Sequence, residues 1–158
     1  PVGAFGGRAD VMDLFDPAEP NGFGQSGTYS ANPITMAAGL AMLKALTPAA
    51  FEHLNGLSAH LKNGLNEMFA RKGVQGICVS LGSVFSFYFT DVKELKDYRS
   101  LATNDREMTQ QVFLSLLEQG YYLSFGLGMC AICLPTEMSH IDGLIEAVDK
   151  AIDEVKKN

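Results

Sequence analysis

The feature that most constrains the fold is an abrupt change of pattern at Asn32-Pro33. Residues 1–31 are rich in glycine and proline and show little periodicity, apart from one possible helical turn over 9–15. Asn32 can cap a helix, and Pro33 suits a first helical turn because its missing N–H would have no partner there. The sequence therefore predicts an irregular segment that leads into regular structure.

Two helices are predicted directly after this change. The first, over 34–46, is apolar on almost every side, which is typical of a helix that is buried on most sides. The second begins at Thr47-Pro48 and carries apolar residues at intervals of three and four up to Gly73, a residue suited to end a helix. We expect this second helix to lie with one face on a core.

The remainder predicts a sheet with further helices. Residues 77–81 and 85–89 alternate in polarity about a glycine-containing pair, which indicates a β-hairpin. Asp105 can cap the next helix, and short strands are expected over 121–125 and 129–134. The order ααββαββα indicates an α+β fold, with helices on a largely antiparallel sheet.

The last helix and the cysteines complete the expectations for the fold. Ser139 and Asp142 have a spacing like that of a capping box, so we expect the last helix to open there. Cys130 and Cys133 form a CxxC motif in a predicted strand, where positions three apart face opposite sides. Both are therefore interpreted as buried, reduced structural cysteines, and no metal site is expected.

Composition excludes several classes of function. The net charge is −6 and only twelve Lys and Arg are present, so there is no basic stripe that could neutralise the phosphates of a nucleic acid. No stretch approaches the roughly 18 apolar residues of a membrane span, and residues 1–30 lack the pattern of a secretory signal. We therefore expect a cytoplasmic protein with no nucleic-acid or membrane partner.

Few residues carry obvious chemistry. His53, His60 and His140 all fall on predicted helices with no nucleophile beside them, so we interpret them as partly exposed helix residues. The run GQSGTYSANP over 24–33 differs, because glycines and hydroxyl residues ahead of a helix can bind a phosphate through backbone N–H groups. A loop that merely enters a helix would account for the same spacing.

A resemblance to a known family narrows these alternatives. The segments PVGAFGGR (1–8) and GTYSANPITMAAG (27–39) resemble motifs of glutamate-1-semialdehyde aminomutases and related class III aminotransferases. The likeness continues through GSVFSFYFTD (82–91), EQGYYL (118–123) and the final helix, in the family's order. Several ordered motifs are far more specific than any one alone.

The resemblance implies the C-terminal portion of a fold-type-I enzyme that uses pyridoxal 5'-phosphate (PLP). Residues 1–46 would then finish the large PLP-binding domain and its connecting helix, and residues 47–158 would form the small C-terminal α+β domain. The Schiff-base lysine of the family would precede Pro1, since neither Lys44 nor Lys62 has the family's surroundings for it. These 158 residues alone are therefore expected to be inactive.

The same resemblance implies cofactor contacts. In this family the threonine of the GT-x-S motif reaches the cofactor phosphate of the neighbouring subunit in a homodimer. The matching threonine in this sequence is Thr28, so the resemblance implies that Thr28 binds that phosphate, with Gly27 and Ser26 as further backbone contacts. The substrate would be a small amino acid or amine.

Three functions stay open. Aminomutases, which are isomerases, carry a glutamate where alignment places Met129, which is a candidate for the substrate pocket. No arginine that could bind a carboxylate follows Arg106. This departure favours an aminotransferase that moves an amino group between an amino acid or amine and a keto compound. The alternatives are an aminomutase that makes a tetrapyrrole precursor and tolerates the exchange, and a non-catalytic α+β interaction module.

Overall fold

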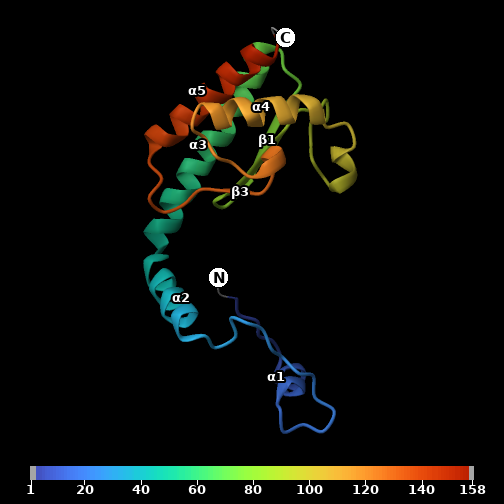
Figure 1. Cartoon of the computed structure of the whole chain (residues 1–158), viewed down its shortest axis with the longest axis vertical. Coiled ribbons are helices and arrows are strands. Elements are labelled where there is room, and N and C mark those ends of the chain that lie inside the picture. The colour runs from blue at the N-terminus through green and yellow to red at the C-terminus, as the bar shows by residue number, and fades with distance from the viewer. Residues whose placement is uncertain (1–2, 157–158) are drawn as a thin grey trace. The chain divides into compact units, whose positions relative to one another are not determined.

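A computed structural model describes residues 3–156 of the chain and divides it after Thr47 into two compact units (Figure 1). The first unit contains α1 (Ala9–Met12), a short 3-10 helix η1 (Asp13–Phe15) and α2 (Pro33–Ala45). The second unit contains α3 (Pro48–Lys72), β1 (Ile77–Leu81), β2 (Val84–Tyr88), η2 (Tyr98–Leu101), α4 (Arg106–Glu118), η3 (Phe125–Leu127), β3 (Cys130–Ala131) and α5 (Met138–Val155).

Helix α2 begins where the sequence predicts. The Asn32 side chain accepts hydrogen bonds from the backbone N–H groups of Ile34 and Thr35, at 3.1 and 3.2 Å. Pro33 occupies the first turn, and the N–H of Met36 donates to the carbonyl of Asn32. The first-turn donors of α2 are therefore all used within the chain.

The expected burial of α2 is wrong for the chain as described. Only Thr35 and Gly39 of this helix are buried, whereas Ile34, Leu40 and Leu43 are exposed by 81%, 55% and 69%. The reason is that the described part of the first unit holds no strand and no second long helix that could cover α2.

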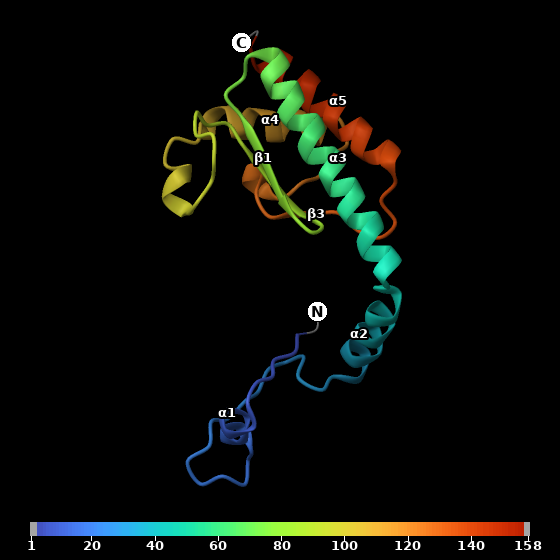
Figure 2. The ribbon, with the colours of Figure 1, turned by 180° about the vertical axis from the view of Figure 1, so that it is seen from behind.

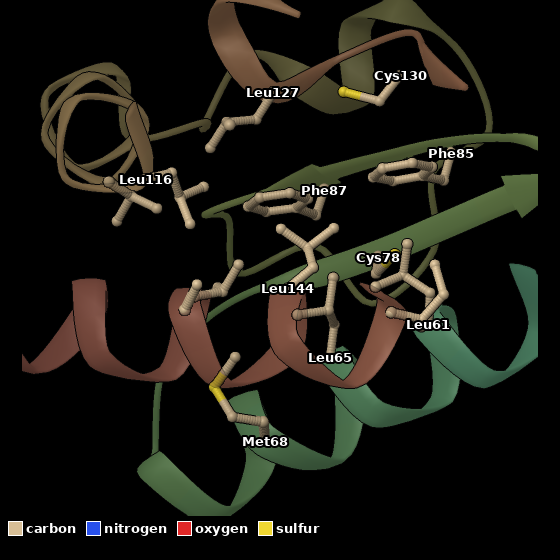
Figure 3. Close-up of a cluster of buried hydrophobic side chains, with 14 of the residues drawn as sticks. Leu61, Leu65, Met68, Cys78, Phe85, Phe87, Leu116, Leu127, Cys130 and Leu144 are labelled. Carbon is tan, nitrogen blue, oxygen red and sulfur yellow. The ribbon is translucent and has the colours of Figure 1, made fainter. Parts of the chain in front are cut away.

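The second unit supplies the hydrophobic core. Figures 1 and 2 show α3 and α5 side by side against the hairpin, and α3 faces the core with a stripe of apolar residues three and four apart. Figure 3 shows Phe87 between Leu127 and Leu144. The fully buried large side chains are Leu57, Leu61, Leu65, Met68, Phe69, Cys78, Phe87, Val112, Leu116, Leu127, Val148 and Ile152.

The sheet confirms the predicted hairpin and the antiparallel α+β class. Its strand order is β1-β2-β3 with both pairings antiparallel, and Leu81 pairs with Val84 across the loop Gly82-Ser83. Gly82 has a φ of 57°, a left-handed conformation that favours glycine.

The open edge of β1 is held by a side chain of α3. The Asn66 amide donates to the carbonyl of Cys78 at 3.0 Å, and the N–H of Cys78 donates to the Asn66 amide oxygen at 2.8 Å. Since an edge strand otherwise presents unpaired backbone groups, Asn66 fixes both the strand and its distance from α3.

The two strands predicted after α4 are largely wrong. The structure assigns no strand to residues 121–125, and only Cys130–Ala131 of the expected 129–134 pairs in the sheet. Gly126, Leu127 and Met129 have φ values of 76°, 59° and 55°. These left-handed residues turn the chain sharply, which is incompatible with a continuous extended strand.

Helix starts in the second unit are predicted with mixed success. Asp105 caps α4 as expected, accepting the N–H of Met108 at 2.9 Å. The capping box of α5 is formed by Glu137 and His140, so the expected pair Ser139 and Asp142 is wrong. Both of those residues lie inside the helix, because α5 begins at Met138.

The cysteines differ from one another. Cys78 and Cys130 are buried, and burial raises the pKa of both thiols, that of Cys78 to about 12. Cys133 is exposed, so the expectation of burial is wrong for it, because the chain has left the sheet after Ala131.

Candidate functional site

The loop that precedes α2 consists of two overlapping turns. The N–H of Ser30 donates to the carbonyl of Gly27 at 3.0 Å, and the N–H of Asn32 donates to that of Tyr29 at 3.3 Å. Ala31 has a φ of 53°, which redirects the backbone into the helix cap. The sequence thus folds residues 27–32 into a compact bend.

This bend leaves a set of hydrogen-bond donors free. Within residues 3–156, the Thr28 hydroxyl and the backbone N–H groups of Ser26, Gly27 and Thr28 form no hydrogen bond. All three residues are exposed. A Cβ on Gly27 would lie 3.3 Å from the Ser30 hydroxyl, so glycine keeps the bend tight without displacing a neighbour.

The free donors fit the chemistry of a phosphate group. A phosphate accepts several hydrogen bonds, and consecutive backbone N–H groups beside a hydroxyl are donors of the kind that bind it. The N-terminus of α2 contributes no free donor, because Asn32 occupies the N–H groups of Ile34 and Thr35. Ser26, Gly27 and Thr28 thus offer four free donors in the loop ahead of this helix.

Met129 lies in the second unit, on a backbone that two neighbours fix. Its N–H donates to the hydroxyl of the buried Ser86 at 2.9 Å, and Leu127 two residues before it is fully buried. The Met129 side chain is nevertheless 80% exposed. The hydrogen-bonded backbone with its positive φ therefore directs this side chain outward. Of the predicted site residues, Ser26, Gly27 and Thr28 lie together on the loop of the first unit, whereas Met129 belongs to the second unit.

The histidines have structural contacts, as the helix interpretation expects. His53 Nε2 lies 3.0 Å from the carbonyl of Thr136, and His60 Nε2 lies 2.6 Å from an Asp142 carboxylate oxygen. His140 Nδ1 accepts the N–H of Glu137 at 2.9 Å. The contacts of His53 and His60 join α3 to the start of α5 and the segment before it, whereas that of His140 is local to the start of α5.

Two negative findings apply to the described residues. Residues 3–156 contain no group of three His, Cys, Asp or Glu side chains that could hold a metal ion. No single helix within them has both the length and the apolar character needed to cross a membrane, and α2 and α3 meet that test only as a pair across the break between them.

Comparison with known proteins extends over almost the whole chain. The family model for class III aminotransferases matches residues 1–152. A glutamate-1-semialdehyde 2,1-aminomutase of Clostridium perfringens (strain SM101 / Type A) is 35% identical over 153 residues, which cover 94% of this chain. The match covers 35% of that relative, so the chain spans about a third of its length.

Solved structures give the same result. A β-phenylalanine aminotransferase from Variovorax paradoxus has a TM-score of 0.82 and 35% identity, over 94% of this chain and 34% of that one. A transaminase solved with PLP bound has a TM-score of 0.75 and 27% identity, over 94% of this chain and 34% of that one. On the evidence of motifs, sequence and fold together, this chain belongs to the class III aminotransferase family.

Proposed function

We propose that the protein bearing this chain is a PLP-dependent aminotransferase that moves an amino group between an amino acid or amine and a keto compound. Membership of the family supports the reaction class. The observation that carries the proposal is the free donor set of Ser26, Gly27 and Thr28 ahead of α2. When bound, PLP withdraws electrons from the carbon that carries the amino group.

The role proposed for this chain is to hold and orient, since its share of the site is small. The Thr28 hydroxyl and the N–H groups of Ser26, Gly27 and Thr28 bind the cofactor phosphate. Residues 1–46 complete the large cofactor domain and residues 47–158 form the small domain. The Schiff-base lysine precedes Pro1 in the full-length protein.

A point substitution tests the phosphate contact. In the full-length protein, Thr28→Val removes the hydroxyl while keeping the branched shape, and we expect PLP affinity to fall about tenfold because one hydrogen bond to a charged group is lost. Thr28→Ser keeps the hydroxyl and should stay near the parent. Cofactor titration by absorbance measures both, and equal affinities for the Val variant and the parent would contradict the contact.

We further propose that Thr28 acts across a homodimer, on the phosphate of the neighbouring subunit. The exposure of this loop and of the apolar side of α2 supports an interface at the first unit. If Thr28 binds the phosphate of the neighbouring subunit, dimers mixed from two variants should bind PLP differently than if Thr28 binds the phosphate of its own subunit.

Subunit mixing separates the two arrangements. Subunits with Thr28→Val are mixed with subunits in which the Schiff-base lysine is replaced by alanine. If Thr28 acts across the dimer, each mixed dimer contains one site with an intact lysine and an intact Thr28. In an equal mixture, about half of the sites that keep the lysine should then bind PLP with the affinity of the parent protein. If Thr28 acts within its own subunit, no mixed dimer has such a site.

An aminomutase is the second proposed function, favoured by the 35% identity to the aminomutase of C. perfringens. The exposed Met129 argues for the aminotransferase, since aminomutases carry a glutamate at that position and a thioether cannot exchange protons. The full-length enzyme should be assayed with glutamate-1-semialdehyde and no added amino acceptor. Formation of 5-aminolevulinate at a turnover above that with amino donors would favour the aminomutase.

A further inference from the structure

A cavity of the second unit lies beside α4. It has a volume of about 370 Å³ and lies between the first turns of α4 and the segment Phe125-Gly126. Small-molecule sites have volumes of roughly 300–1,000 Å³, so this cavity is large enough for a small ligand.

One face of α4 lines the cavity with a charged, a polar and an aromatic side chain. Arg106, Gln110 and Phe113 are four and three residues apart, so they lie on the same side of the helix. Phe125 packs edge-to-face on Phe113, with ring centroids 5.5 Å apart. The cavity is therefore cationic at its α4 start and aromatic at the other end.

The other polar groups of the wall already have partners. Asn104 accepts the N–H of Phe89 at 3.0 Å and donates to the Thr109 hydroxyl at 3.3 Å. The Thr109 hydroxyl donates to the carbonyl of Asp105 at 2.6 Å. Within the described residues, the Arg106 guanidinium and the Gln110 amide form no hydrogen bond, so these two groups are available to a ligand.

Within the described residues Arg106 forms no ion pair, although the chain has a net charge of −6. The acidic residues next to it in sequence are engaged by α4 itself, because Asp105 caps the N–H of Met108 and Glu107 accepts from Gln111. By contrast, Arg71 pairs with Asp149. Arg106 therefore lines this cavity with a guanidinium that has no ion-pair partner within the described residues.

We propose that the second unit binds a small carboxylate with an aromatic tail in this cavity. The carboxylate accepts hydrogen bonds from Arg106 and Gln110, and the tail lies against Phe113 and Phe125. This site goes beyond the amino-transfer function, and it needs neither the cofactor nor the first unit.

The probe is 3-phenylpropionate, titrated into the full chain by calorimetry without PLP, at about 150 mM salt to screen distant charges. We expect saturable binding that Arg106→Gln weakens about tenfold, through loss of a charge-assisted pair. Arg99→Gln is the matched control, because Arg99 is also exposed and unpaired within the described residues but does not line this cavity. It should weaken binding by less than about twofold.

Two further measurements complete the test. Phe125→Ala removes an aromatic wall that is 80% exposed, so it should weaken the probe while leaving the melting temperature unchanged. The neutral amide 3-phenylpropanamide should bind more weakly than the acid. The proposal is overturned by absent binding, by equal losses in the two arginine variants, or by equal affinity for acid and amide.

Discussion

At the scale of single residues, Asn66 joins two elements through one side chain. It satisfies both backbone groups of Cys78 at the edge of β1. Asn66→Ala should lower the free energy of unfolding by about 1–3 kcal/mol, because partly buried backbone groups lose their partners. Asn63→Ala, at an exposed position of the same helix, should change it by less than about 0.5 kcal/mol. Urea denaturation measures both, and equal effects would contradict this role.

Cys78 gives the unfolding free energy a pH dependence. Burial raises its pKa from 9.0 to about 12, so the folded state disfavours the thiolate. The resulting stability is present below the unfolded pKa of 9.0 and is lost as the pH rises from there towards about 12. Denaturation between pH 8 and 11 should show this loss. Cys78→Ala should make the curve shallower, and part of the remaining slope belongs to Cys130, whose pKa burial also raises. Cys133→Ser, at an exposed position, is the control variant.

Helix caps show how far residue-scale prediction reaches. Asn32 and Asp105 are correctly predicted because each directly precedes its helix and accepts local N–H groups. The cap of α5 is missed because Glu137 and His140 are less common capping residues than the nearby Ser139. The bond from Asn66 to β1 has no sequence signal, since it depends on how α3 packs.

At the scale of elements, α3 is the helix on which the core of the second unit depends. Leu65 is fully buried in that core. Leu65→Ala should therefore cost about 2–5 kcal/mol of unfolding free energy, through lost transfer energy and the cavity left behind. Leu81→Ala is the matched control, since Leu81 is 87% exposed at the hairpin end. Chemical denaturation of the two variants should separate them by at least 1 kcal/mol, and a smaller gap would contradict the packing described.

The helices and the hairpin could be predicted because their patterns are local. The alternation on both sides of Gly82-Ser83 and the three-and-four spacing along α3 each reflect a single buried face. The segment 121–131 could not, because its path is set by tertiary contacts. Leu127 reaches the core only through a left-handed backbone, which costs energy that its burial offsets.

At the scale of the whole molecule, the second unit carries its own core. Every residue of the buried cluster lies between Leu54 and Ile152. A polypeptide of residues 48–158 should therefore fold by itself and unfold cooperatively. Circular dichroism and calorimetry check this, and loss of a cooperative transition would show that the first unit is required.

Whether a candidate site could be predicted from the sequence depends on whether its residues are contiguous. The loop of Thr28 is recognised from contiguous motifs, whereas the cavity beside α4 joins a helix face to Phe125 and leaves no contiguous pattern. The proposed dimer and larger domain would cover the exposed apolar side chains of α2, and residues 34–46 alone do not define such a partner.

The packing of α5 on α3 has a consequence for how the chain is made. Leu61 and Leu65 are buried together with Leu144 and Val148, which are synthesised about eighty residues later. At roughly 5–20 residues per second, the part of the α3 stripe that α5 covers stays exposed for several seconds, although the hairpin follows α3 directly. Premature termination before α5 would make that exposure permanent, and the shortened product would become a substrate for chaperones and proteases.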